Sequence, residues 1–149
     1  MFVVAATVVN EDWGAAMRIH AHARDGVLII EPRERLTDET DREFTATVLS
    51  VLRAGRPWLI LDLAAVPYLD SLGIGAIVHA YTSTRRAGGM LKLVHVTGRN
   101  RQLLTVTKIL TVLEAYDTED DAVRSFEADH VDPERDPMLS GDAILGLAV

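Results

Sequence analysis

The chain of 149 residues contains no cysteine, which excludes disulfide bonds, thiolate zinc sites and thiol nucleophiles together. It also has no apolar run that approaches the roughly 20 residues needed to span a bilayer. Its apolar start, residues 1–9, has no basic region before it, so it does not have the form of a secretory signal. We therefore expect a cytoplasmic protein that does not insert into a membrane.

Positive charge is scarce, because 15 Lys and Arg face 22 Asp and Glu and leave a net charge of −7. A surface that binds nucleic acid directly needs clustered Lys and Arg, so we expect no such partner. The 48% share of hydrophobic residues and the length suit one globular domain with terminal additions. We divide the chain into an N-terminal extension at 1–16, a domain at 17–129 and a C-terminal tail at 130–149.

The most informative stretch runs from Trp58 to Ala80. It begins with an apolar run of strand length, Trp58–Leu63, which is typical of a buried strand. After a turn-like segment, apolar residues recur at helical spacing, at Leu72, Ile74, Ile77, Val78 and Tyr81. Asp70 and Ser71 lie where a helix needs acceptors for its unpaired N–H groups, and we predict Ser71 as the N-cap.

A hydroxyl at this helix N-terminus has two interpretations. A phosphate attached to Ser71 would find free N–H donors and a favourable helix dipole. Gly73 and Gly75 keep the first turn free of bulk, so the backbone of a partner could approach the serine closely. This combination suits a phosphorylation switch. In the alternative, Ser71 only caps the helix and the glycines only permit the helix to pack on the strand.

The remaining patterns predict an α/β fold. Before the central strand and helix, they indicate a half-exposed strand at 17–24, a hairpin turn at Asp25-Gly26 and a strand at 27–30. A helix capped by Thr37 or Asp38 follows, with an apolar stripe of Phe44, Val48, Leu49 and Leu52. After the central strand and helix, they indicate a strand at 90–96, a helix from Arg99 to about Thr107, a strand-like piece within 109–116 and a last helix starting near Asp117. This order predicts a small mixed sheet of four to five strands with about four helices packed beside it.

The pattern from Asp70 to Ile77, D-S-x-G-[apolar]-G-x-[apolar] after a buried strand, resembles the signature of STAS-domain anti-sigma-factor antagonists. The resemblance extends from about Met17 to Phe126. It implies the STAS fold, and it implies that an anti-sigma factor that is also a serine kinase phosphorylates Ser71. The unmodified domain would bind that factor and so free a sigma factor, and phosphorylation would end the binding. The residues that we expect at the partner surface are Thr37, Asp38, Thr40, Tyr68, Asp70, Ser71, Leu72, Gly73 and Gly75.

Three positions depart from the family pattern. Glu34 stands where a glycine is usual, Thr37 where an aspartate is usual, and Leu72 where a second small hydroxyl residue is common. A second interpretation therefore stays open, in which the domain is a STAS scaffold or an accessory subunit of a signalling assembly or membrane transport system, without phosphorylation switching. The two apolar ends, residues 1–9 and Ala143–Val149, favour it because they suggest additional contacts. A homodimer is a further option.

We expect no enzyme activity and no cofactor. Gly73-x-Gly75 lacks the third glycine of a dinucleotide loop and the Gly-Lys-Ser/Thr ending of a P-loop. Two weaker alternatives are a carboxylate pair of Asp62 and Asp70, and a hydrolase pair of Ser71 with His79 or His95. The serine does not lie in a G-x-S-x-G elbow, which disfavours the hydrolase.

Two histidines on one face of the first predicted strand, His20 and His22, are a candidate metal pair. The sequence offers no third ligand at a useful spacing, so we expect no metal site and interpret them as surface residues.

Overall fold

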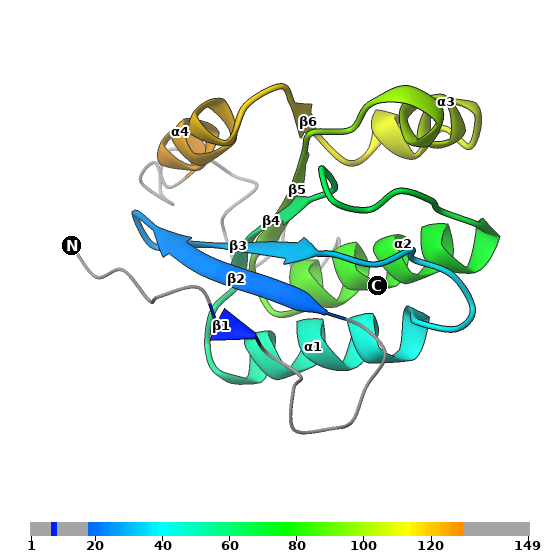
Figure 1. Ribbon diagram of the computed structural model, residues 1–149. Coiled ribbons are helices and arrows are strands. Elements are labelled where there is room, and N and C mark those ends of the chain that lie inside the picture. Colours follow the sequence, from blue (N-terminus) through cyan, green and yellow to red (C-terminus); the bar gives the residue numbers. More distant parts are fainter. Residues whose placement is uncertain (1–6, 9–17, 130–149) are drawn as a thin grey trace.

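The computed structural model describes residues 7–8 and 18–129, which form one six-stranded sheet with helices on both faces (Figure 1). The strands are β1 (Thr7–Val8), β2 (Ile19–Arg24), β3 (Val27–Pro32), β4 (Trp58–Asp62), β5 (Met90–Val94) and β6 (Ala115–Tyr116). The helices are α1 (Asp41–Arg53), α2 (Ser71–Arg86), α3 (Gly98–Val106) and α4 (Glu119–Asp129), and a 3-10 turn, η2, spans Ile109–Thr111.

The strands lie in chain order across the sheet. The first three pair antiparallel, and β3 to β6 pair parallel. Each parallel step needs a crossover, and α1, α2 and α3 occupy the three crossovers in turn. In the centre of the sheet, Leu59 of β4 is paired with Leu28 of β3 and with Leu91 of β5, and all three side chains are buried.

The sheet is covered on both faces, which explains why its central strands read as continuous apolar runs. Leu28, Ile30, Leu59 and Leu61 share one core with α1 and α2. The alternate positions of β3 and β4 and the last residue of β5 point the other way and share a second core with α4: Val27, Ile29, Ile60 and Val94. Figure 1 shows α1 and α2 below the sheet and α4 above it.

The expected fold class is confirmed, and the strand order places the connections as the sequence predicts. The sheet has six strands rather than four to five: β6 lies within the strand-like piece expected at 109–116, and the additional strand is β1, an edge strand of two residues. Two residues carry no alternating pattern, so an additional strand of this length has no signal in the sequence. In the described part of the chain, no helix is both long enough and apolar enough to cross a membrane.

The start of α1 differs from the expectation. Thr40 is the N-cap residue, rather than Thr37 or Asp38, because residues 37–40 form a turn in which the Thr37 carbonyl accepts from Asp41 N at 2.8 Å. The buried stripe is also rotated relative to the predicted one. Phe44, Thr47, Val48 and Val51 are the buried residues, whereas Leu49 and Leu52 are half-buried.

Candidate functional site

The residue before the serine caps α2. Asp70 has an extended backbone (φ −116°, ψ −174°), and its Oδ1 accepts from Gly73 N at 2.9 Å. Ser71 is therefore the first helical residue and not the N-cap, so that prediction is wrong. A carboxylate one residue earlier reaches the same backbone N–H as well as a serine would. Ser71 itself is exposed at the positive end of the helix.

The loop after β3 is clamped to the segment that precedes α2. Leu36 N donates to Tyr68 O at 2.9 Å, and Asp70 N donates to Leu36 O at 3.4 Å. These bonds frame an isolated parallel bridge between Leu36 and Leu69, both of which are fully buried. The backbone around Ser71 is thus held by a contact between two loops that follow neighbouring parallel strands.

The two glycines of the motif have different surroundings. A Cβ on Gly73 would overlap the carbonyl oxygen of Leu36, so only glycine permits the close approach of that loop. Gly73 is buried, and the backbone that approaches it belongs to this chain. Gly75 is exposed and has no atom within 4 Å of an added Cβ. Of the two, Gly75 is the one whose surface a partner can reach.

The candidate residues of the loop between β3 and α1 also divide into buried and exposed ones. Thr40 Oγ1 donates to Arg35 O at 2.6 Å and accepts from Thr37 N at 3.0 Å. Thr37 Oγ1 in turn accepts from Glu39 N at 3.3 Å. Both threonines are buried and hold the shape of the loop, whereas Asp38 is exposed.

A cation next to the site escaped the sequence analysis. The Arg99 guanidinium lies 4.2 Å above the ring of Tyr68, and its Nη1 donates to Leu69 O at 3.0 Å. Arg99 lies in the first turn of α3, which follows β5. The carboxyl ends of parallel strands meet at one edge of a sheet, and this placement is the signal that could have found Arg99. The exposed surface around Ser71 therefore combines Tyr68 (39% exposed), Leu72 (51% exposed) and Arg99.

The proposed carboxylate pair does not form, and His95, one of the two candidate partners of Ser71, contacts Asp62. Asp62 is buried at the end of β4, where its Oδ1 accepts from Ala64 N and lies 2.9 Å from His95 Nδ1. Asp62 thus contacts His95 rather than Asp70, whose carboxylate caps α2. Asp62 links the end of β4 to the residue that follows β5, which is a structural arrangement.

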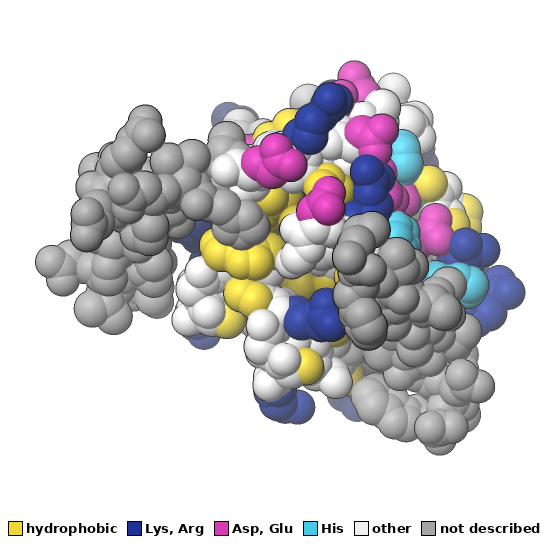
Figure 2. Space-filling view, turned by 90° about the vertical axis from the view of Figure 1, so that its left-hand side faces the viewer, with side chains coloured by type: hydrophobic (Ala, Val, Ile, Leu, Met, Phe, Trp, Pro, Cys, Tyr) yellow, Lys and Arg dark blue, Asp and Glu magenta, His cyan; other side chains and the backbone are white. Residues whose placement is uncertain are grey.

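One histidine of the candidate metal pair, His22, contacts α4. His22 Nε2 is 3.2 Å from Glu119 Oε2, and the same oxygen accepts from Arg24 Nη1 at 2.7 Å. Arg24 also donates to Asp120 at 2.6 Å. Figure 2 shows acidic, basic and histidine side chains interspersed on this face. Among the residues described, no group of three or more His, Cys, Asp or Glu side chains is placed to hold a metal ion.

These contacts shift two pKa values. Burial raises the pKa of Glu119, but the hydrogen bonds from Arg24 and His22 outweigh it and leave the pKa lower than usual. Hydrogen bonds to Glu119 and Asp120 raise the pKa of Arg24. The ion pairs join β2 to α4, which are far apart in the sequence.

Comparison with known proteins agrees with this geometry. The model of the STAS domain family matches residues 18–122. A candidate anti-sigma factor antagonist of Thermotoga neapolitana is 28% identical over 104 residues, which cover 69% of this chain and 92% of that protein. The anti-sigma F factor antagonist of Paenibacillus polymyxa is 25% identical over 116 residues, which cover 74% and 96%. The crystal structure of a candidate anti-sigma factor antagonist from Thermotoga maritima superposes with a TM-score of 0.66 at 27% identity, covering 70% of this chain and 91% of that one. Each of these relatives is named as an antagonist of an anti-sigma factor.

Proposed function

Because this chain belongs to the STAS domain family, we propose that it is an anti-sigma-factor antagonist whose binding surface is the start of α2. The partner is an anti-sigma factor with serine-kinase activity, and phosphorylation of Ser71 ends the binding. The observation that carries the proposal is an exposed serine in the first turn of α2, between the exposed apolar side chains of Tyr68 and Leu72. The names of the curated relatives support the partner class.

The contact surface that we propose consists of the exposed members of the set expected from the sequence: Asp38, Tyr68, Ser71, Leu72 and Gly75. Thr37, Thr40, Asp70 and Gly73 act beneath it, because their hydrogen bonds and close contacts fix the backbone on which the exposed residues stand. Binding buries the apolar side chains of Tyr68 and Leu72, and Arg99 offers a charge at the edge of the surface.

The same surface explains how a phosphate would act. A phosphoserine adds a charge of about −1.5 to −2 at neutral pH, which a partner seated on Tyr68 and Leu72 would have to desolvate. The fold itself tolerates the charge, since Ser71 is exposed and lies at the positive end of a helix dipole. The modification would therefore remove the partner without unfolding the domain.

Three further points belong to this proposal. The binding unit is residues 17–129. The segment 1–16, which supplies the edge strand β1, and the segment 130–149 are additions to it. The protein acts in the cytoplasm, where sigma factors and their regulators meet. A homodimer is compatible with this role and is decided by the mass of the isolated protein in solution.

Intact-mass analysis tests the modification. The protein is incubated with a candidate anti-sigma kinase and ATP, and the parent is compared with Ser71→Ala and with Ser50→Ala, an exposed serine on α1 that serves as the control. We expect one phosphate on the parent and on Ser50→Ala, and none on Ser71→Ala. A parent that stays unmodified by a kinase that phosphorylates other antagonists would argue for the scaffold or accessory alternative.

A binding titration with the same anti-sigma factor tests the surface. Ser71→Asp should fold normally but lose binding, while Ser71→Ala should bind as tightly as the parent. Leu72→Ser should weaken binding without phosphate, because it removes the most exposed apolar side chain of the site. Unchanged affinity in both Ser71→Asp and Leu72→Ser would place the partner elsewhere on the domain.

A further inference from the structure

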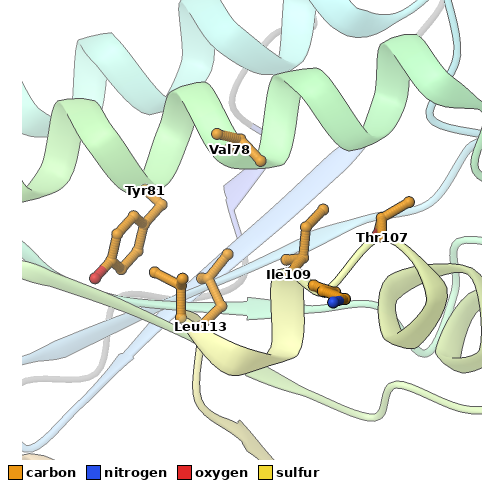
Figure 3. A pocket seen from close by; sticks show the side chains of 7 residues that line it. Val78, Tyr81, Thr107, Ile109 and Leu113 are labelled. Carbon is orange, nitrogen blue, oxygen red and sulfur yellow. The ribbon is translucent and has the colours of Figure 1, made fainter.

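A groove of about 240 Å³ opens between α2 and the segment around η2. Its lining residues are Val78 and Tyr81 from α2, with Thr107, Lys108, Ile109, Val112 and Leu113 on the opposite side. Figure 3 shows Val78 and Tyr81 projecting from α2 toward Ile109 and Leu113. We call this the α2–η2 groove. It is apolar apart from Thr107 and Lys108, and Val78 and Val112 remain 42% and 59% exposed.

The rim of the groove carries a cation in an unfavourable backbone conformation. Lys108 has φ 62° and ψ 18°, in the left-handed region that normally favours glycine. Strained residues of this kind concentrate where a site needs them. Of the described residues that line the groove, none is acidic, although the chain as a whole carries a net charge of −7. A matching ligand therefore has apolar side chains next to a carboxylate.

The chain contains a segment with this chemistry. Residues 142–149, DAILGLAV, begin with one carboxylate at Asp142 and continue with apolar residues. They lie outside the residues that the structure describes. We propose that the segment Asp142–Val149 binds the α2–η2 groove, with its apolar side chains against Val78 and Val112 and the Asp142 carboxylate paired with Lys108. The contact does not depend on phosphorylation of Ser71.

The end of α4 lies within reach of the groove. Phe126 packs edge-to-face on Trp58, the first residue of β4, with ring centroids 6.1 Å apart. The last turns of α2 come to the same end of the sheet, since Arg85 Nη1 lies 3.7 Å from Met90 Sδ at the start of β5. Residues 130–141 span up to about 40 Å when extended. They can therefore pass the sheet edge at β6, which is only two residues long.

Tethering makes a small contact sufficient. A segment on a short linker reaches an effective concentration of the order of millimolar, so a groove that binds a free peptide weakly is filled by the attached one. Val78 and Val112 of the groove are exposed to water, and contact with the apolar side chains of Ala143–Val149 would cover them.

The absence of native cysteine permits a direct test by disulfide cross-linking. We compare the full-length double variant Val112→Cys/Leu147→Cys with Ser50→Cys/Leu147→Cys, whose first cysteine lies on the exposed side of α1. Under mild oxidation we expect the groove pair to close within one chain about 10-fold faster or more. Equal rates in the two variants would overturn the proposal. Cross-linked dimers whose share rises with protein concentration would also overturn it and would assign the groove to a second copy.

Charge variants test the role of Lys108. Lys108→Glu should slow closure of the Val112→Cys/Leu147→Cys pair, and addition of Asp142→Lys should restore it. Lys108→Gly gives a second readout, because it relieves the left-handed backbone and so raises the urea midpoint while it slows closure. The pairing of Lys108 with Asp142 would be contradicted by a rate of disulfide closure that rises together with the urea midpoint in Lys108→Gly. It would also be contradicted by a closure rate that neither Lys108→Glu nor the added Asp142→Lys changes.

Discussion

The start of α2 and the attachment of α4 are held in opposite ways. At the start of α2, backbone groups of two loops bind each other, and the contact depends on a missing side chain at Gly73. On the other face, α4 packs on an apolar core and adds charged contacts, through Lys92 and through the pair of Arg24 with Glu119. A backbone clamp changes little with pH or salt, whereas ion pairs respond to both. The proposed partner site therefore stands on the less responsive of the two regions.

The largest expected effect breaks the backbone clamp. Gly73→Ala places a Cβ against the carbonyl oxygen of Leu36. That oxygen is a backbone atom that cannot rotate away, so the loop that carries Leu36 must move. We expect a loss of about 3 kcal/mol in the free energy of unfolding, measured by urea denaturation. Gly75→Ala is the matched control, since its Cβ enters open space in the same helix, and it should gain about 0.5 kcal/mol. Equal effects of the two substitutions would refute the clamp.

A second prediction separates the contribution of the Lys92 charge to the attachment of α4 from the contribution of its packing. Lys92 is 1% exposed, donates to Ser125 Oγ at 2.8 Å and lies 4.5 Å from the centre of the Phe126 ring. Lys92→Ala should lower the free energy of unfolding by about 2 kcal/mol, because removal of the buried methylene chain leaves a void under α4. Lys92→Met keeps the stem and should stay within about 1 kcal/mol of the parent, since its ion partner Glu114 is exposed to solvent. Thermal unfolding of both variants decides between packing and charge, and a Met variant as unstable as the Ala variant would favour charge.

The same contrast explains what the sequence can predict. The strand and helix order follows from apolar periodicity, and the motif from Asp70 to Gly75 marks the start of α2 because its residues are neighbours in the chain. The reason why Gly73 must be glycine lies at Leu36, which is remote in sequence and has no pattern of its own. The burial of Lys92 against α4 and the stacking of Arg99 on Tyr68 are also contacts between distant residues.

The error in the cap position has a different origin. Asp70 and Ser71 both have side chains that can cap a helix, so composition does not separate them. The choice is made by the backbone, because Asp70 N donates to Leu36 O and holds Asp70 in the extended conformation that a cap requires. Local propensity proposes the two candidates, and the contact between loops selects one.

A third prediction separates these two residues. Asp70→Ala removes the acceptor for Gly73 N and should lower the free energy of unfolding by about 1 kcal/mol. Ser71→Ala removes no capping bond and should stay within about 0.3 kcal/mol of the parent, which an exposed first-turn position permits. Urea denaturation of both variants gives the comparison. If Ser71→Ala were the more costly change, the serine would be the cap after all.

The smallest expected effect depends on pH and belongs to the α4 side. The pKa of Glu119 is lower in the folded protein, because the hydrogen bonds from Arg24 and His22 outweigh the cost of burial. A lowered carboxyl pKa contributes stability that is present above the unfolded pKa and is lost as the pH falls through the folded value. Glu119→Gln should therefore lower stability at pH 7 by less than about 1 kcal/mol, since the pair is partly exposed.

The pH profile decides whether this difference comes from the ion pair. The gap between the parent and Glu119→Gln should shrink as the pH falls below about 4.5, the ordinary pKa of a glutamate side chain, because the parent then loses the same charge. Glu127→Gln, at an exposed position of the same helix, is the matched control and should follow the parent throughout. Urea midpoints measured at intervals across this range give the profile. A gap that persists unchanged well below that pH would mean that Glu119 holds α4 by its shape, and the pH dependence expected of the α4 side would then not come from this ion pair.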